Sequence, residues 1–600
     1  MTTKLRIAAT FRTAIELLFI FCAFQVLQLQ IPLALYENGG GLSALALCVE
    51  KMLPPTLYPL FLFGALAAFR LRAPEQSLAL WEKLFCCGFS LFLMIGDSYA
   101  AIDSWDLVFG SAASILLSAA TLVGLTAIVL CALRWLKHLL GKLLEWEVTL
   151  PTLWQKHPFL FPWAVIFLCW LPYILVRLPA AIDFDAYIQI ETAFGIRPLT
   201  AYNPVFSTLL IGNIIKLGAA LFGSNEAGLT LFIVFQALIG SAIFAYTTVT
   251  MGKLKVPVIV QMIALGIYSI ATIYPNYMTV ILKDSLYSAM SILLLALIIE
   301  EVMLPHSRKR CVGIFAAALL TGLLRNNGFL ILWACCAAAI GCLLVSRNRK
   351  WRGLVLALVI ACILQSLYSN ALLPALGVPE GPMGESLSIP FQQTARYVRD
   401  YPEDVTEEEA AAIAAVLDYE NLAELYDPNL SDPVKGSNSG NSEALPEYFK
   451  VWFKQFFRHP TVYIQATLNN AYGFFHPNSR EYIFWYTTIS TNEMVFDEIE
   501  QLYPLKIAAR YLVMLFETFP LTMPLCNTGC NMWLALYLLC SALARRDRKL
   551  LFPFASVLIS MLVCIACPVF LINGIRYALP VIYAVPLLSA LSLRKENTDT

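Results

Sequence analysis

The sequence predicts an all-α polytopic membrane protein. Of its 600 residues, 59% are hydrophobic and only 14% are charged, and the mean hydropathy is +0.69. Soluble domains carry about 25% charged residues, and a helix needs about 20 apolar residues to cross a bilayer. Many apolar runs in this chain approach that length. The formal net charge is +0, so overall charge does not indicate a nucleic-acid partner.

Residues 1–158 are predicted to be an accessory unit of transmembrane helices. Lys4, Arg6 and Arg12 precede an apolar run that has no small-residue cleavage site. We therefore expect a retained helix with the N-terminus inside. Three more helices follow, and the basic amphipathic segment 133–147 is expected to lie along the inner interface. The unit contains little that suggests chemistry.

Residues 159–373 are predicted to form the transmembrane core. Basic inner loops set the parity of the crossings. Two apolar runs, 205–222 and 229–248, lie between an outer loop and the inner marker Lys253, so only one of them can cross. We expect the first run to be a juxtamembrane helix at the outer face, because it follows Pro204 and is interrupted by glycines and polar residues.

Residues 374–505 form an acidic segment that parity places outside the membrane. It carries 20 acidic and 7 basic residues, which gives a net charge of −13. Helices are expected at 403–424 and 448–457, in either a small domain or an elaborated loop. Residues 506–600 add an outer juxtamembrane helix and the closing transmembrane helices. The whole chain then makes about fourteen crossings, with both termini inside.

Polar side chains from five places in the sequence are expected at the outer ends of these helices. Ionisable groups at a membrane edge are costly and usually functional. A mixture of acids, amides and cations suits a site that holds an anionic lipid phosphate while an acid acts on a hydroxyl group. The set consists of Asp183, Asp185, Gln189, Tyr202, Asn203, Lys283, Asp284, Arg325, Asn326, Asn327, Arg576 and Tyr577.

Within this set the predicted roles differ. Asp185 is the expected general base and Asp183 a second catalytic acid, because a positioned carboxylate can take a proton from an attacking hydroxyl group. Lys283, Arg325 and Arg576 are expected to hold the phosphate, the arginines with a fork of two donors. The other residues are predicted to bind substrate. No cofactor is predicted, and a divalent cation shared by the two aspartates stays open, although two acids are a small ligand set.

Each of these residues also has a purely structural interpretation. The arginines can snorkel to headgroups, the Lys–Asp pair can start a helix, and the Asn–Asn–Gly run can form a turn. Gln189 and Asn203 can satisfy backbone groups near helix breaks. The two aspartates can simply mark a helix end in water. No single motif is specific, so the prediction depends on their joint arrival on one face.

Five sequence motifs carry a resemblance to a known superfamily. They are DFDAYIQ at 183–189, YNP at 202–204, ILKDS at 281–285, LLRNNG at 323–328 and NGIRYALP at 573–580. Together they resemble the GT-C superfamily of membrane glycosyltransferases, which use polyprenyl-phosphate sugars, and within it a poorly characterised bacterial branch. The resemblance covers about 159–594. Relatives tend to show His before the proline of the second motif, where this chain has Asn203.

The resemblance implies a GT-C-like bundle and an inverting transferase in the cytoplasmic membrane, active on its extracytoplasmic face. It implies Asp185 as the base, juxtamembrane helices after it, and cations near the lipid phosphate. Such an enzyme moves a sugar from a polyprenyl-phosphate carrier to a cell-surface glycan, lipid or protein. A lipid-linked glycan flippase or transporter is the alternative, and a sensory or assembly subunit is a third. Polar groups at one end of mostly clean helices favour chemistry over transport.

The 16 cysteines predict neither a metal site nor a disulfide framework. Nearly all lie inside apolar runs, where Cys packs as a small hydrophobic residue, and no spacing matches a zinc or haem site. Cys526 and Cys530, near an outer membrane edge, are the candidates for a disulfide.

Overall fold

The computed structural model describes residues 13–20, 58–346, 351–477, 503–519, 521–566 and 574–594. It is 78% helical, and its described part contains one sheet of two short strands. The prediction of a nearly all-α protein is therefore confirmed. The apolar run after Arg12 is described only over residues 13–20. Its remainder and Asn573 lie outside the described residues.

Eight helices in the described part are long and apolar enough to cross a membrane, which supports a multi-pass membrane protein. They are α4 (Leu80–Ile102), α6 (Ala112–Leu144), α10 (Val205–Phe222), α11 (Asn225–Lys253), α14 (Lys283–Met303), α16 (Gly328–Ser346), α17 (Trp351–Leu367) with the turns that follow it, and α30 (Ile575–Ser592). Shorter apolar helices are α8 (Leu160–Val176), α12 (Val258–Ile270), α25 (Tyr503–Thr518), α27 (Thr528–Ala544) and α29 (Phe554–Ile565).

The remaining helices and strands connect these elements. Near the membrane helices they are α3 (Tyr58–Leu71), α5 (Asp106–Phe109), α7 (Thr152–Lys156), β1 (Ala181–Ile182), α9 (Phe184–Ala193), α13 (Ile273–Met278), β2 (Val280–Ile281), α15 (Arg308–Leu324), α18 (Leu373–Ala375), α26 (Met523–Cys526) and α28 (Arg548–Leu551). A π-helical turn, Tyr368–Leu372, joins α17 to α18.

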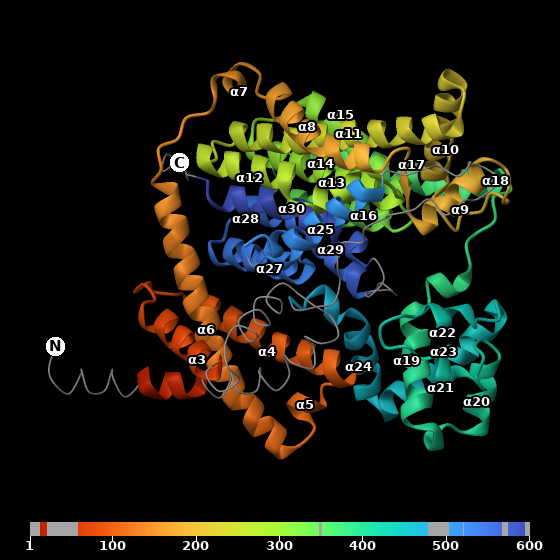
Figure 1. Cartoon of the computed structure of the whole chain (residues 1–600). Coiled ribbons are helices and arrows are strands. Elements are labelled where there is room, and N and C mark those ends of the chain that lie inside the picture. Colours follow the sequence, from red (N-terminus) through yellow and green to blue (C-terminus); the bar gives the residue numbers. More distant parts are fainter. Residues whose placement is uncertain are drawn as a thin grey trace.

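Two helices lie at the centre of the bundle. Buried residues make up 83% of the apolar stretch of α14 and 78% of that of α30. Figure 1 shows these two helices beside α11 and α12 in the upper part of the view, with α27 and α29 below them. Helices that are apolar all round belong in such a position. The first turns of α14 and α30 carry Lys283 and Arg576, two of the predicted site residues. Because both helices are buried in the bundle, their packing holds these residues in place.

Close approach of α10 to α11 depends on two glycines. A Cβ on Gly218 would lie 2.5 Å from the Gly228 Cα, and one on Gly228 would lie 2.1 Å from the Ile215 carbonyl oxygen. The two apolar runs predicted at 205–222 and 229–248 are observed as α10 and the longer α11, and the chain breaks between them at Gly223 and Ser224. Small residues allow membrane helices to pack backbone against backbone. This pair supports α9, which precedes it.

The N-terminal helices dock on the C-terminal part through aromatic rings. Phe85, Phe89 and Phe92 of α4 contact Trp533 of α27, with ring centroids 5.5, 5.1 and 5.7 Å apart. The predicted interfacial connector at 133–147 is different in the structure. Most of it continues α6 without a break as far as Leu144, because no proline interrupts it and the single glycine, Gly141, is tolerated within the helix.

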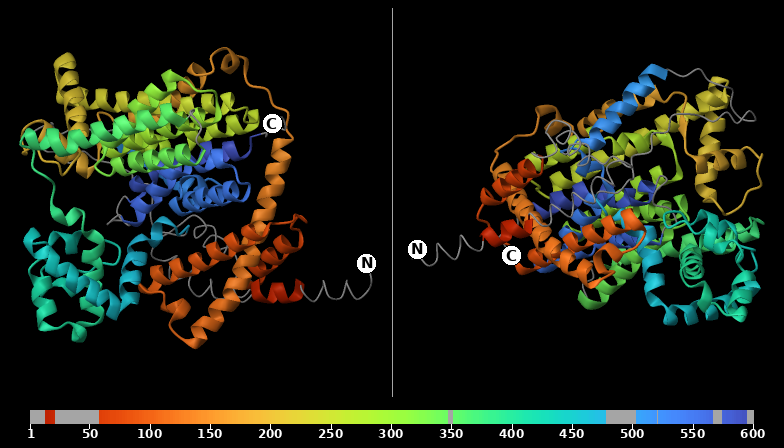
Figure 2. Two further views of the ribbon diagram at one scale, coloured as in Figure 1. Left: turned by 180° about the vertical axis from the view of Figure 1, so that it is seen from behind. Right: turned by 60° about the horizontal axis from the view of Figure 1, so that its bottom comes forward.

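The acidic segment folds into a lobe with its own core, drawn in green to cyan in Figures 1 and 2. Its helices are α19 (Ser388–Asp400), α20 (Glu407–Ala414), α21 (Leu422–Leu425), α22 (Asp432–Gly436), α23 (Leu445–Arg458) and α24 (Pro460–Ala471). One 3-10 turn, Met383–Glu385, precedes the lobe, and residues 478–502 of the acidic segment lie outside the described residues.

Two helices were expected in this segment, and one expectation is wrong. The aromatic helix expected at 448–457 is observed as α23. The single helix expected at 403–424 is split into a 3-10 turn, α20 and α21, because the chain turns at 415–421 to bury Val416 and Leu417 in the core of the lobe.

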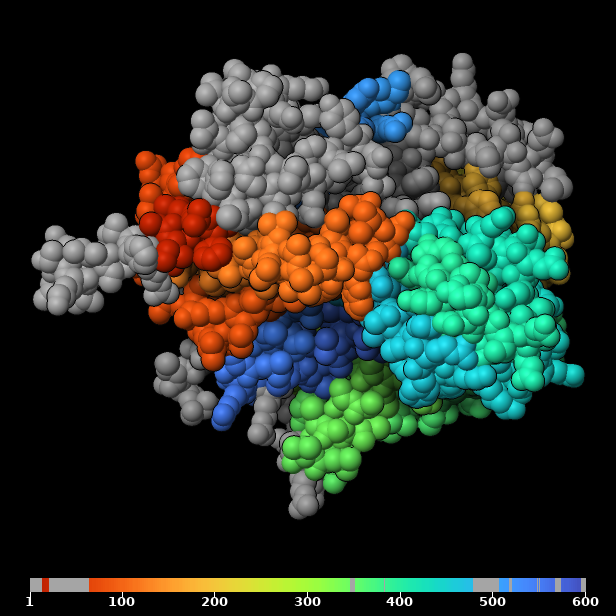
Figure 3. Space-filling model, turned by 90° about the horizontal axis from the view of Figure 1, so that it is seen from below, coloured from red at the N-terminus to blue at the C-terminus, as the bar shows by residue number. Residues whose placement is uncertain are grey.

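The lobe contacts the N-terminal helices at the turn between α4 and α5. Arg396 of α19 and Asn469 of α24 both donate to the Asp103 carbonyl oxygen, at 3.1 and 3.0 Å. Gln465 accepts from the Ser104 hydroxyl group at 3.1 Å. Figure 3 shows the lobe and these orange helices side by side on one face of the molecule. The accessory unit therefore helps to position the acidic lobe.

Candidate functional site

A two-stranded parallel sheet brings the first acidic loop to the start of α14. Ala181 pairs with Val280 and Ile182 pairs with Ile281, and the Asp183 amide then donates to the Ile281 carbonyl oxygen at 3.1 Å. Parallel strands carry the residues that follow them to the same edge. Asp183 and Lys283, each just beyond its strand, therefore emerge together.

Asp183 also begins α9. Its Oδ1 accepts a hydrogen bond from the Asp185 amide at 3.1 Å, so the side chain serves as the N-cap. A carboxylate in this position satisfies a helix-end donor, and the helix dipole favours a second carboxylate in the first turn. Asp185 occupies that first turn. The local sequence therefore fixes both acids at the same helix end.

Two cations converge on Asp185. Its Oδ2 lies 3.0 Å from Lys283 Nζ and 2.9 Å from Arg576 Nη1, and the same Nη1 lies 3.3 Å from Asp183 Oδ1. The three side chains of Asp185, Lys283 and Arg576 are 16%, 15% and 14% exposed, so solvent reaches each of them. Burial alone would raise the pKa of Asp185, but Lys283 and Arg576 hold it well below its usual range. Asp185 is a paired carboxylate at neutral pH.

A second ion pair lies behind the first. Arg325 Nε is 2.9 Å from Asp284 Oδ1, and both side chains are almost completely buried. The Tyr577 ring lies between the two guanidinium groups, with Arg325 Cζ 4.5 Å and Arg576 Cζ 5.1 Å from its centroid. Cations stack favourably on aromatic faces. Tyr577 therefore connects the two pairs into one group, which we call the acid–cation cluster.

The acid–cation cluster has balanced charge and unused donors. Its formal charges are three carboxylates against three cations, drawn from Asp183, Asp185, Asp284, Lys283, Arg325 and Arg576. Buried nitrogens with no hydrogen-bond partner among the described residues are Asn203 Nδ2, Arg325 Nη1 and Arg576 Nε. Buried donors are nearly always satisfied. The carboxylate oxygen Asp284 Oδ2 is also buried without a hydrogen-bond partner among the described residues. The cluster therefore has unused capacity for both signs of charge, and the three nitrogens are the part that suits an anionic ligand.

The loop 201–204 closes one side of the cluster. Asn203 Oδ1 accepts from Lys283 Nζ at 2.7 Å, and Asn326 Nδ2 donates to the carbonyl oxygens of Ala201 and Tyr202 at 3.1 and 3.0 Å. Burial and the nearby carboxylates of Glu385 and Asp185 raise the pKa of Tyr202. Three of the predicted residues, Tyr202, Asn203 and Asn326, therefore belong to one bonded loop beside the acids.

The acidic segment folds back onto this loop. The Ala201 amide donates to the Pro379 carbonyl oxygen at 2.8 Å. A Cβ on Gly381 would lie 3.1 Å from the Tyr202 Cα, so glycine permits the contact. The start of the acidic lobe is thus part of the wall of the site.

Two predicted residues have other surroundings. Gln189 is fully buried, and its Nε2 donates to Ser207 Oγ at 2.7 Å and to Thr208 Oγ1 at 3.0 Å, which ties α9 to α10. Asn327 is exposed, and its carbonyl oxygen accepts from the Leu330 amide in the first turn of α16. The structural interpretation accounts for the contacts of both residues.

Two supporting residues were absent from the predicted set. Arg177, 1% exposed, donates to the Asn276 carbonyl oxygen at 2.6 Å and to Thr279 Oγ1 at 2.7 Å. Gln236 Nε2 donates to the carbonyl oxygens of Met278 and Val280, at 3.1 and 2.7 Å. Both side chains brace the segment that leads into β2. An arginine directly after an apolar helix was the available signal for the first.

A hollow of about 350 Å³ opens next to the loop 201–204. Ala201 and Asn326 line its end nearest to the cluster, and Gln365, Ser369 and Asn370 line its polar floor. A second, more apolar hollow of about 390 Å³ adjoins it along α16 and α17, and the two share Trp333, Ser366 and Asn370. Volumes of this size are typical of small-molecule sites.

The two aspartates hold a cation of the protein itself. Arg576 Nη1 bridges Asp183 and Asp185, at the position that a shared divalent ion would take. The two cysteines that were candidates for a disulfide are both free: Cys526 lies against Thr272, with Sγ 3.5 Å from Oγ1, and is not joined to Cys530.

Comparison with known proteins supplies a family. The model of a family of unknown function, DUF6020, matches residues 195–600. The chain belongs to DUF6020. The matched range includes Asn203, Lys283, Arg325 and Arg576 but begins after the loop that carries the two aspartates. No curated protein and no solved structure matches the chain. The resemblance to GT-C enzymes therefore depends on the sequence motifs alone.

Proposed function

We propose that this DUF6020 protein is an integral membrane glycosyltransferase that takes a sugar from a polyprenyl-phosphate carrier. The observation that carries the proposal is the contact of Asp185 with two cations at a solvent-reachable end of a membrane bundle. A carboxylate beside phosphate-binding cations is the minimum that such a transfer requires.

The proposed reaction is a single displacement. An acceptor hydroxyl oxygen attacks the anomeric carbon and forms the new glycosidic bond, while the bond from that carbon to the phosphate oxygen breaks. The electron pair leaves with the polyprenyl phosphate, and the hydroxyl proton passes to Asp185. Attack opposite the leaving group inverts the anomeric centre. Lys283 and Arg576 hold the phosphate, and Arg325 and Tyr577 support Arg576 from behind.

Binding of the donor would also activate the base. In the free protein Asp185 is held by Lys283 and Arg576, which keeps its pKa low and makes it a weak base. A phosphate that takes these two cations releases the carboxylate, and its pKa rises toward the usual range. Because the cluster is neutral before binding, the phosphate has to compete with Asp185 for the cations. The base therefore gains its proton affinity only when the donor is present.

The two hollows supply room for the substrates. The more apolar one along α16 and α17 suits the first part of a lipid chain, and the mixed one beside Asn326, which Gln365, Ser369 and Asn370 also line, suits a sugar. The acidic lobe, which contacts the loop at Ala201, is in position to present an acceptor glycan, lipid or protein.

The proposal includes a topology with about fourteen crossings in the cytoplasmic membrane and the cluster on the extracytoplasmic face. In it, α10 and α25 are outer juxtamembrane helices of a GT-C-like bundle. The length of α14, about 30 Å between its two charged ends, supports one of these crossings.

The test is sugar transfer by Asp185→Asn in proteoliposomes that contain polyprenyl-phosphate sugars and envelope acceptors. We expect transfer to fall by about 10²–10⁴-fold while the melting temperature stays near that of the unmodified protein. Asp547→Asn is the matched control, because Asp547 pairs with Arg594 at the other end of α30. Full transfer by a folded Asp185→Asn protein would remove Asp185 from the mechanism.

The same assay separates the enzyme from a flippase or transporter. A flippase would move labelled lipid-linked glycan across the proteoliposome bilayer without forming a new glycosidic bond. Lipid movement without any transfer product would therefore replace the proposal with that alternative.

A further inference from the structure

A second polar cluster lies at the opposite end of α14. Glu301 is in the last turn of α14, His306 is in the connection to α15, and Cys311 is in the first turn of α15. One donor atom from each side chain lies within 4.8 Å of the other two. Because α14 is about 30 Å long, this Glu–His–Cys cluster is remote from the acid–cation cluster.

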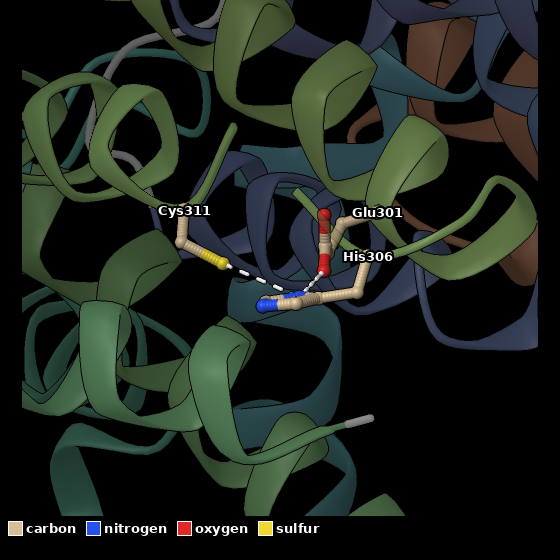
Figure 4. Close-up of side chains that lie close together, drawn as sticks. All are labelled: Glu301, His306 and Cys311. Carbon is tan, nitrogen blue, oxygen red and sulfur yellow. Dashed lines mark hydrogen bonds and ion pairs between the residues drawn. The ribbon is translucent and has the colours of Figure 1, made fainter. Parts of the chain in front are cut away.

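The histidine ring faces both partners with one nitrogen. His306 Nδ1 lies 2.6 Å from Glu301 Oε1 and 4.0 Å from Cys311 Sγ. Figure 4 shows the dashed lines from this nitrogen to the carboxylate and to the sulfur. Three different donor types thus point at one small volume.

Neighbouring groups orient these side chains. Arg310 Nη1 lies 2.8 Å from Glu301 Oε2, which leaves Oε1 directed toward the histidine. Glu300 Oε1 in turn lies 2.8 Å from Lys253 Nζ, and its other oxygen lies 3.3 Å from Arg310 Nε. Ligand carboxylates in metal sites are commonly held by such outer hydrogen bonds.

Helix α17 closes the cluster on one side. A Cβ on Gly353 would lie 2.7 Å from His306 Cε1 and 3.1 Å from Cys311 Sγ, so the helix packs against both residues through a glycine. Glu301 is 2% exposed, whereas the His306 side chain is 44% exposed. The cluster is therefore enclosed at the carboxylate and open to water at the imidazole.

We propose that Glu301, His306 and Cys311 bind one thiophilic divalent cation of the zinc class, with water as the fourth ligand. Carboxylate, imidazole and thiolate are all zinc ligands, and a tetrahedral ion separates its ligand atoms by about 3.5 Å. To reach this spacing, the carboxylate–imidazole distance of 2.6 Å has to open and the imidazole–sulfur distance of 4.0 Å has to close, each by less than about 1 Å. The carboxylate–sulfur distance, which is within 4.8 Å, has to close by at most about 1.3 Å. The ion ties the end of α14 to the start of α15. This inference is independent of the proposed function.

The test is metal binding by the purified full chain in detergent, with Co²⁺ as a spectroscopic probe after removal of metal by a chelator. We expect one equivalent of Co²⁺ with a thiolate-to-cobalt charge-transfer band and the intense visible bands of four-coordinate cobalt, both displaced by Zn²⁺. Cys311→Ser should abolish the charge-transfer band, and His306→Ala should weaken binding by at least about 100-fold. Cys169→Ser, which alters an exposed thiol on α8, is the matched control and should leave the spectrum unchanged.

Thermal unfolding shows whether a variant has lost only the metal site or the folded structure as well. Zn²⁺ should raise the melting temperature of the unmodified protein and of Cys169→Ser, by mass action on the native state. It should leave that of Cys311→Ser unchanged, although this variant still melts cooperatively. Absence of the charge-transfer band in the unmodified protein, or an undiminished band in Cys311→Ser, would overturn the proposal.

Discussion

Lys283 Nζ lies 3.0 Å from Asp185 Oδ2 and donates to Asn203 Oδ1 at 2.7 Å, so one ammonium group joins two of the segments that form the site. The strand pair β1–β2 places this lysine beside the acid, and the loop 201–204 completes its surroundings. Lys283 thus belongs both to the packing of the site and to its charge balance.

Replacing Lys283 by Gln should therefore lower activity more than stability. We expect proposed sugar transfer to fall by about 10–100-fold, because a phosphate contact is lost, while unfolding free energy falls by about 1–3 kcal/mol. The measurement is transfer in proteoliposomes together with thermal unfolding. Lys253→Gln removes a similar ion pair, with Glu300, at the far end of α14 and should keep full transfer. Equal losses in the two variants would contradict a specific role for Lys283.

The low pKa of Asp185 predicts a particular pH dependence of stability. Because the folded pKa lies below the unfolded value of about 3.9, the paired carboxylate stabilises the fold above that pH. This contribution should fall away as the pH drops below about 4 toward the folded pKa. Between pH 7 and pH 3, the difference in melting temperature between the unmodified protein and Asp185→Asn should begin to narrow below about pH 4 without vanishing, because the folded pKa lies lower still. Curves that stay parallel would show that Asp185 is not held by cations in the native state.

The gathering of the site residues could be anticipated because it follows from helix parity. Loops that leave the same end of a bundle must bring their side chains to one region, and Lys283 and Arg576 do both contact Asp185. Their catalytic and binding roles stay predictions. Gln189 could not be placed from the sequence, because a side chain four residues after Asp185 on a helix can face either the cations or α10.

Other features depend on tertiary contacts that leave little trace in the sequence. The strands β1 and β2 are two residues each within apolar surroundings, so no alternating pattern marks them. The Glu–His–Cys cluster has no paired cysteines, and its side chains meet only because α15 turns back along α14. The helix expected at 403–424 is split because the chain turns to bury Val416 and Leu417 in the core of the lobe.

The glycine contact between α10 and α11 predicts a strong effect from one added methyl group. Gly228→Ala would place a Cβ 2.1 Å from the Ile215 carbonyl oxygen, and the helices would have to separate. We expect a loss of about 1–3 kcal/mol or more in unfolding free energy. Gly266→Ala on α12 is the matched control, since its Cβ would meet nothing within 4 Å and helix propensity should make it neutral or slightly stabilising. Thermal unfolding in detergent measures both, and similar melting temperatures would contradict the close packing.

We expect the stability of the acidic lobe to depend on one buried carboxylate, that of Glu409. Glu409 is 2% exposed, and its Oε1 lies 2.9 Å from Arg458 Nη2 and 2.8 Å from Lys454 Nζ, which joins α20 to α23. Burial would raise the pKa of Glu409, but hydrogen bonds from Arg458 and Lys454 lower it to about 2. Its stabilising effect is therefore complete above the unfolded pKa of about 4.3 and is lost as the pH falls toward 2.

We expect Glu409→Gln to destabilise this lobe by about 1–3 kcal/mol at neutral pH and to remove most of its extra acid sensitivity. Hydrogen exchange of the full chain, followed by peptides from α20 and α23, measures the lobe separately from the bundle. Glu447→Gln is the matched control: its partner is Lys450, both side chains are more than half exposed, and such a surface pair contributes little. Exchange that is unchanged in Glu409→Gln, or equally faster in Glu447→Gln, would show that the lobe is held together by its apolar core rather than by this ion pair.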